Sequence, residues 1–181
     1  HITPTMVILQ AGEIHTGAFD DFKSIIPLAH AHNAWVHIDG AFGLWAAASP
    51  QYAHFMEGAE EADSWATDGH KWLNVPYDSG YAFIAHPAAH FKTFTSQAGY
   101  LKEDGKARDE YNWTPELSRR ARGYTTYAVI KELGSTGIED LVERCCRHAA
   151  AIVEGAGQLP HVEVLAYPII NQGILRFRNP S

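Results

Sequence analysis

The 181-residue chain opens with a strand, a helix and a second strand in close succession. Residues 5–10 (TMVILQ) and 34–39 (AWVHID) are short apolar runs, which are typical of buried strands. Between them, residues 20–32 have the apolar spacing of an amphipathic helix, and Asp20 and Asp21 suit its start. This order predicts a βαβ unit, in which a helix joins two parallel strands.

The remaining elements are shorter or are interrupted by glycine. In chain order we expect a short helix near 50–57, strands at 62–66 and 81–85, a polar surface loop at 95–112, helices at 115–132 and 138–155 separated by a break at 134–137, and strands at 162–165 and 174–177. We therefore expect an α/β fold in two parts. Residues 1–120 would form a mostly parallel sheet flanked by helices, and residues 121–181 would form linking helices and the beginning of a small α+β domain.

Composition narrows the classes of function. The chain is 46% hydrophobic, which allows a sizeable core, and no apolar run is long enough to cross a membrane. A net charge of −7 argues against nucleic-acid binding. The adjacent Cys145 and Cys146 fit a reducing, cytoplasmic setting. The eleven histidines lack a zinc-site pattern, so we expect no metal site. Because the chain opens on His1, we expect it to be part of a longer protein.

Two residues suggest chemistry at the ends of strands. Asp39 ends the second apolar run, at the carboxyl edge of the sheet, where ligands bind. Its carboxylate would either pair with a cationic ring nitrogen or cap the following turn. Lys71 lies in a Gly-His-Lys-Trp turn beside apolar residues. Partial burial disfavours the charged form of a lysine and leaves an amine able to form a Schiff base, whereas an exposed lysine is a solvated charge.

Together these segments resemble the group II pyridoxal-phosphate-dependent amino-acid decarboxylases, which include the aromatic-amino-acid, histidine and glutamate decarboxylases. The resemblance implies the fold-type I (aspartate aminotransferase) fold and covers the central part of a family member. It is carried by short pieces in family order, namely Thr16-Gly-Ala-Phe-Asp20, His37-Ile-Asp-Gly-Ala41, Ala62-Asp-Ser64, His70-Lys-Trp72, Tyr77-Asp-Ser-Gly80, Tyr100-Leu-Lys102 and Leu117-Ser-Arg-Arg120.

The resemblance implies a role for each matching residue. Lys71 would hold pyridoxal 5′-phosphate as a Schiff base, and Asp39 would keep the pyridine nitrogen protonated, so that the ring accepts the electrons left when CO2 departs. Ala41 would lie against the ring. His70 would lie beside the phosphate or the Schiff base, and Thr16 would contact the cofactor.

Two further residues are implied outside this group. Tyr100, in the polar loop, would protonate the carbon that loses CO2, and Arg119 would organise the site or a contact between subunits. The chain also departs from the family pattern. Glu13 and Ile14 stand where many members have a threonine pair. Asp68 stands where relatives often have asparagine, and because a carboxylate would repel a phosphate, Asp68 would instead cap the turn or bond His70. His37 would steady the Asp39 carboxylate or be an ordinary core histidine.

The implied reaction is decarboxylation of an L-amino acid to an amine, in a homodimer. Alternatives are another fold-type I enzyme (an aldehyde synthase, a carbon–sulfur or carbon–carbon lyase, or an aminotransferase) or a non-catalytic truncated fragment. Phe42 and Trp45 favour a bulky or aromatic substrate over glutamate. In the family, the phosphate cradle and the histidine that stacks on the ring would precede His1. We therefore expect the 181 residues alone to be inactive.

Overall fold

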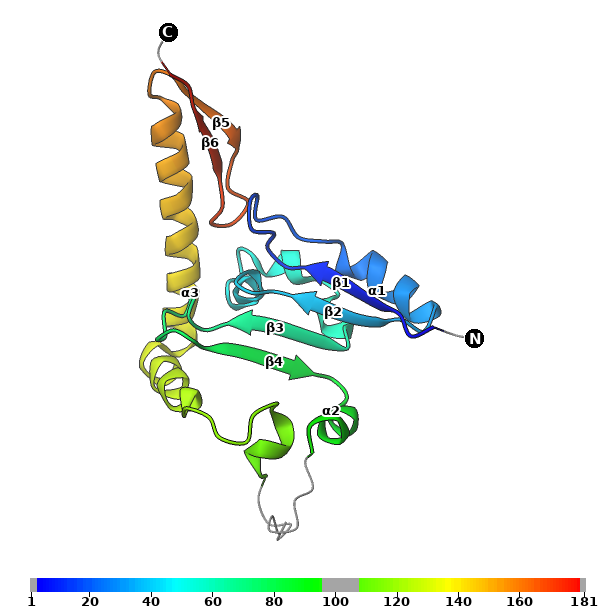
Figure 1. The fold of residues 1–181 in the computed structure, drawn as a ribbon. Coiled ribbons are helices and arrows are strands. Elements are labelled where there is room, and N and C mark those ends of the chain that lie inside the picture. Colours follow the sequence, from blue (N-terminus) through cyan, green and yellow to red (C-terminus); the bar gives the residue numbers. More distant parts are fainter. Residues whose placement is uncertain (1–2, 96–107, 180–181) are drawn as a thin grey trace.

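The computed structural model describes residues 3–95 and 108–179, and it contains a four-stranded sheet and a separate hairpin beside a long helix (Figure 1). In chain order the strands and α-helices are β1 (Met6–Gln10), α1 (Phe22–Ala31), β2 (Trp35–Asp39), β3 (Ser64–Asp68), β4 (Gly80–Ile84), α2 (Pro87–Phe94), α3 (Arg122–Gly157), β5 (Val162–Ala166) and β6 (Ile174–Phe177). Short 3-10 helices cover Gly43–Ala48, Ala53–Met56, Ala59–Glu61 and Glu110–Trp113.

The sheet is mixed. Strands β1, β2 and β3 are parallel neighbours, which agrees with the predicted βαβ unit, and β4 pairs with β3 in the antiparallel direction. The register places Gln10 beside Asp39, at the last pair of β1 and β2. In Figure 1 the carboxyl ends of the three parallel strands all point toward α3. Loops that follow these strands therefore gather at one edge of the sheet.

Helix α1 covers one face of this sheet and makes the main core. Its start is capped by Asp21, whose Oδ1 accepts the Ser24 N–H at 3.1 Å. Phe22 and Ile26 are 1% and 0% exposed and belong to one apolar cluster with Val36 on β2. Burying each such side chain stabilises the fold by about 1.5–3 kcal/mol.

The segment after β2 differs from the expected helix at 50–57. The 3-10 helices Gly43–Ala48 and Ala53–Met56 occur there instead. Gly43 passes so close to β1 that a Cβ atom on it would lie 2.1 Å from the Ala11 carbonyl oxygen. Packing against the strand therefore fixes the path of this alanine-rich segment and overrides its local helix propensity.

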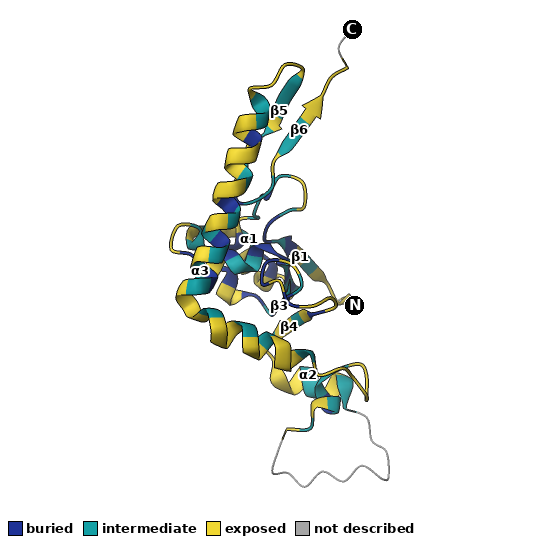
Figure 2. Ribbon diagram, turned by 90° about the vertical axis from the view of Figure 1, so that its left-hand side faces the viewer, coloured by how far each residue is buried: buried dark blue, intermediate teal, exposed yellow. Residues whose placement is uncertain are grey.

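Helix α3 also departs from the prediction. The helix expected at 115–132 begins only at Arg122. The predicted break is confirmed, because Gly134 has the non-helical angles φ 63° and ψ −176° and α3 consists of two helical segments that meet at a kink there. After the bend, Ile138, Val142 and Cys146 face the core, while most of the remaining surface of α3 is exposed (Figure 2). None of the helices in the described residues is long and apolar enough to cross a membrane.

The two adjacent cysteines of α3 have different surroundings. Cys146 is 2% exposed, and burial raises the pKa of its thiol to about 11. The reactive thiolate is therefore scarce at neutral pH, as expected for a packing residue. Cys145 is half-buried and faces the cavity described next.

Candidate active site

A cavity of about 950 Å³ opens at the carboxyl ends of β1 and β2. Three groups of residues line it. The strand ends contribute Gln10, Gly12, Glu13, Ile14, Asp39, Ala41 and Phe42, the turn after β3 contributes Lys71, Trp72 and Asn74, and α3 with the β5–β6 loop contributes Leu141, Cys145, Asn171 and Gln172. Asp39, Ala41 and Lys71, which the sequence singled out from separate segments, therefore line one cavity.

Asp39 holds its turn with one carboxylate oxygen. Its Oδ1 accepts the backbone N–H of Ala41 at 3.1 Å, as the turn-capping alternative requires. The cavity lining includes both Asp39 and Ala41, so the same carboxylate faces the space in which a ring would bind. Capping and ligand contact are therefore compatible at this residue. His37, by contrast, bonds Ser64 Oγ through Nδ1 at 2.8 Å.

Lys71 is held at its amine by a neighbouring carboxylate. Its Nζ lies 3.0 Å from Asp68 Oδ2, and its side chain is 43% exposed. The same Asp68 oxygen lies 3.6 Å from His70 Nε2. Asp68, at the end of β3, is thus shared by the two residues that follow it. The contact with His70 is one of the two roles that the sequence suggested for Asp68, whereas its contact with Lys71 was not predicted, although the i, i+3 spacing was a usable signal.

His70 lies in the turn that carries Lys71. Its Nδ1 accepts the backbone N–H of Ser79 at 2.9 Å, so the proton of the neutral ring is on Nε2, toward Asp68. Its ring lies 4.2 Å from that of Tyr77. His70 is not among the residues that line the cavity. Its part in cofactor binding stays a prediction.

Glu13 organises the loop after β1. Its carboxylate accepts the backbone N–H groups of His15 and Thr16, each at 2.9 Å, and the Thr16 hydroxyl at 3.0 Å. These hydrogen bonds, that to the Thr16 N–H first, hold the pKa of Glu13 below its ordinary value. Glu13 lines the cavity and Thr16 does not. The sequence did not identify Glu13 as a site residue, although its spacing from Thr16 indicates a local turn.

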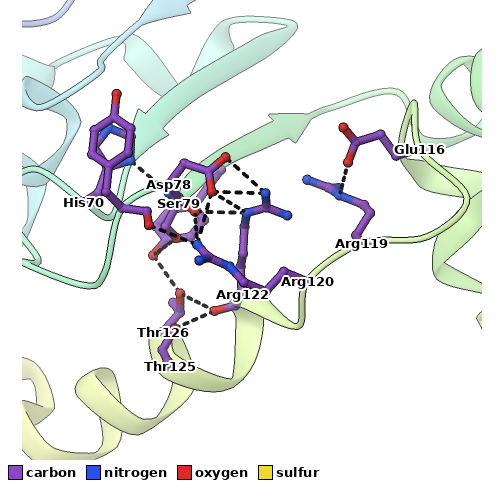
Figure 3. Close-up of polar contacts among 11 residues, drawn as sticks. His70, Asp78, Ser79, Glu116, Arg119, Arg120, Arg122, Thr125 and Thr126 are labelled. Atoms are coloured by element: carbon purple, nitrogen blue, oxygen red, sulfur yellow. Dashed lines mark hydrogen bonds and ion pairs between the residues drawn. The ribbon is translucent and has the colours of Figure 1, made fainter.

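Arg119 is separate from this cavity. Its Nε lies 3.3 Å from Glu116 Oε2, and it lines a second cavity, of about 620 Å³, beside β4 and the start of α3. Figure 3 shows that Arg120 and Arg122, which line the second cavity, are each in ion-pair contact with the Asp78 carboxylate. The Arg122 guanidinium holds the pKa of Asp78 below its ordinary value. Residues 115–121, which the sequence places in a helix, lie before the start of α3, and Arg120, in this segment, donates to the Asp78 carbonyl.

The lining of the first cavity suits pyridoxal phosphate. It offers a primary amine at Lys71, a carboxylate at Asp39 and a small side chain at Ala41. The indole Nε1 of Trp72 is buried and has no hydrogen-bond partner among the described residues. Tyr100 lies outside the described residues, and its predicted role stays a prediction.

Comparison with known proteins agrees with this chemistry. The pyridoxal-dependent decarboxylase conserved domain matches residues 1–178. The aromatic-L-amino-acid decarboxylase of Drosophila lebanonensis is 31% identical over 98% of this chain and 44% of its own. The 4-hydroxyphenylacetaldehyde synthase of Rhodiola rosea is 29% identical over 78% of this chain and 28% of its own. The crystal structure of Oryza sativa TDC with PLP and tryptamine superposes with a TM-score of 0.84 at 23% identity, over 97% of this chain and 36% of its own.

The cavity and these matches together define a pyridoxal-dependent class of protein. The chain belongs to the pyridoxal-dependent decarboxylase family, as the sequence resemblance predicted. It spans less than half the length of the curated relatives to which it is compared here. Its α/β structure matches decarboxylases of fold-type I over about a third of their chains. The division into parts at residues 1–120 and 121–181 stays a prediction.

Proposed function

We propose that the protein to which these residues belong decarboxylates an L-amino acid to the corresponding amine and CO2, with pyridoxal 5′-phosphate as cofactor. One observation carries the proposal, namely that Lys71 and Asp39 line the same cavity at the carboxyl ends of the parallel strands. Membership of the pyridoxal-dependent decarboxylase family supports it.

The cofactor, when bound, supplies an electron sink for the pair left by the departing carboxylate. Lys71 would hold it covalently through Nζ, and Asp68, 3.0 Å from that atom, orients the amine. Asp39 would keep a proton on the ring nitrogen. Its Oδ1 is already fixed by the Ala41 N–H, so the carboxylate needs little reorganisation to do so. His70 and Thr16 would support the cofactor from outside the lining, through the Asp68 and Glu13 carboxylates that they contact.

We assign two residues outside the cavity to the complete site. Tyr100 would deliver a proton to the carbon that loses CO2, and Arg119 would organise a contact between two subunits of a homodimer. An exposed apolar row on the first half of α3 supports pairing of subunits, since Tyr124 and Tyr127 are 77% and 64% exposed. We place the enzyme in the cytoplasm on its pair of reduced cysteines.

A second candidate function is supported by one relative. The chain is 29% identical to a protein named 4-hydroxyphenylacetaldehyde synthase. An aldehyde synthase would consume O2 and release aldehyde, ammonia and peroxide with the CO2, whereas a decarboxylase releases the amine. Tyr100 favours the amine as product. By the family resemblance, members with phenylalanine at this position tend to carry out the oxidative reaction that gives an aldehyde. Product analysis with O2 measurement separates the two.

Replacement of Lys71 tests the proposal. In the full-length protein, Lys71→Ala should remove the visible absorption band of the bound cofactor and reduce CO2 release to background, because Lys71 is the only lysine among the described residues that line the cavity. Lys92→Ala, at an exposed lysine of α2, is the matched control and should leave both unchanged. A Lys71→Ala protein that keeps the band and the CO2 release would show that the assignment is wrong.

A further inference from the structure

The carboxylate of Asp68 is the group that meets the Lys71 amine. Its Oδ2 lies 3.0 Å from Nζ, and among residues 3–95 and 108–179 no other carboxylate is in ion-pair contact with this amine. Asp39 lines the cavity together with Lys71 but is not in ion-pair contact with it. Only the neutral form of an amine is a nucleophile, so Lys71 must lose a proton before it bonds to a carbonyl carbon. Asp68 is the nearest acceptor for that proton.

The position of Asp68 is fixed by contacts that do not use this oxygen. Its backbone N–H donates to the Ala41 carbonyl at 2.9 Å, and Trp45 Nε1 donates to its own carbonyl at 3.1 Å. On β4 its cross-strand partner is Gly80, where a Cβ atom would lie 3.0 Å from Asp68 Oδ1. The missing side chain at position 80 therefore leaves space for the carboxylate, and Oδ2 stays directed to the amine.

His70, the other titratable group in contact with Asp68, is poorly placed to take the proton instead. Its Nε2 lies 3.6 Å from Asp68 Oδ2. Its Nδ1 already accepts the Ser79 N–H at 2.9 Å, so the proton of the neutral ring is on Nε2 and faces the carboxylate. A second proton would go to Nδ1 and would break the hydrogen bond from Ser79. His70 therefore supports the charge of Asp68 and does not compete with it for the proton of Lys71.

We propose that Asp68 accepts the proton of Lys71 whenever this amine bonds to an aldehyde, that of the cofactor included. The Lys71 ammonium gives one proton to Asp68 Oδ2, and the freed electron pair on Nζ bonds to the aldehyde carbon, whose second C–O bond pair moves to oxygen. The oxygen leaves as water with the two remaining amine protons, which gives a C=N bond. The proton on Asp68 then returns to the nitrogen of that bond. The inference rests on the proposed function, because that function supplies the cofactor aldehyde.

Attachment of the cofactor to the full-length apoprotein tests the inference without turnover. Stopped-flow absorbance follows the growth of the visible band after pyridoxal 5′-phosphate is added, and the rate at saturating cofactor separates bond formation from binding. We expect Asp68→Asn to slow this rate by about 100-fold, the lower end of what a positioned acid or base contributes, because an amide oxygen is not a base. Asp140→Asn, at an exposed aspartate of α3 that does not line the cavity, is the matched control and should keep the wild-type rate.

Chemical rescue separates proton transfer from a structural role. The Asp68 side chain is 25% exposed, so a small molecule can enter the space that Asp68→Ala leaves. Formate should raise the attachment rate of this variant by about tenfold or more, whereas formamide, which has a similar shape but is not a base, should not.

Two results overturn the inference, namely a wild-type rate in Asp68→Asn or equal effects of formate and formamide. A wild-type apoprotein that never develops the band overturns the proposed function instead. Attachment of benzaldehyde to Lys71, trapped with borohydride and measured by mass spectrometry, then still reports on Asp68.

Discussion

At the residue scale, Asp39 combines a structural and a chemical duty. Its Oδ1 accepts the Ala41 N–H, and its carboxylate lines the cavity that contains Lys71. An amide side chain could still cap the turn, because its oxygen accepts the same hydrogen bond. It could not hold a proton on a ring nitrogen by its charge, because it carries none. Replacement of Asp39 by asparagine therefore separates the structural role from the chemical one.

We predict that Asp39→Asn will lower kcat by about 100- to 1,000-fold, the scale seen when one fixed electrostatic partner is removed from a reacting centre. The thermal midpoint should change little, because the turn keeps its cap. Steady-state kinetics and thermal unfolding of the full-length holoenzyme measure the two effects. Equal losses of activity and of thermal stability would instead assign Asp39 to the turn alone.

The sequence identified the site residues that local pattern determines. Asp39 follows from a strand end and Lys71 from its turn, each with an alternative that only the family resemblance decided, and Ala41 came from that resemblance alone. Asn171 and Gln172 gave no such signal, since only the packing of Ile170 brings their loop to the cavity. Whether such residues reach the cavity depends on contacts between segments far apart in the chain, and local sequence patterns do not indicate these contacts.

At the element scale, Asp63 joins three elements at the edge of the sheet opposite the cavity. Its carboxylate accepts the Val36 N–H at 2.7 Å and contacts His30 Nε2 at 3.0 Å and His86 Nε2 at 2.7 Å. These residues come from β2, from the end of α1 and from the start of α2. Burial raises the pKa of Asp63, but the hydrogen bonds from Val36, His86 and His30 outweigh it, and the pKa is lowered.

A lowered folded-state pKa makes this stabilisation dependent on pH. The contribution is fully present above the unfolded value of about 3.9 and is lost as the pH falls through the folded pKa. We predict that Asp63→Asn lowers Tm at pH 7 by roughly 3–12 °C, for the loss of charge-assisted hydrogen bonds. The gap between wild type and variant should narrow below about pH 4. A gap that widens in acid would contradict the assignment.

The elements themselves were predictable to different degrees. The βαβ unit and the β5–β6 hairpin follow from apolar periodicity and turn residues, and the structure contains both. The start of α3 was not predictable, because Arg120 and Arg122 bind the Asp78 carbonyl and carboxylate, far away in the chain. These contacts with Asp78 keep residues 115–121 from joining the helix, although their composition favours one.

At the scale of the whole molecule, the first half of α3 presents apolar side chains to solvent. Tyr124, Tyr127 and Ile130 recur at every third position and are 77%, 64% and 40% exposed. Residues three apart lie on one side of a helix, so they form a single row. Under the proposed homodimer, a second copy of the chain covers this row.

We predict that Tyr127→Glu weakens the dimer by about 30-fold or more, the effect of removing an aromatic side chain central to an interface. Sedimentation of the full-length protein at several concentrations measures the change in dissociation constant. Tyr167→Glu is the control, because this tyrosine is 66% exposed but follows β5, away from the row. Equal weakening by both variants, or by neither, would place the interface elsewhere.

The bend at Gly134 determines how far α3 can reach. A straight helix of its 36 residues would measure about 54 Å, well beyond the roughly 30 Å width of a small domain. Because of the kink, the two helical segments of α3 run in different directions, and α3 contacts both Asp78 beside β4 and the β5–β6 hairpin. Nothing lies within 4 Å of a Cβ atom placed on Gly134, yet its dihedral angles are open almost solely to glycine. A side chain at position 134 would therefore meet no neighbouring atom, but the backbone angles there are ones that only glycine adopts readily. We expect that even alanine would change the angle between the two segments of α3.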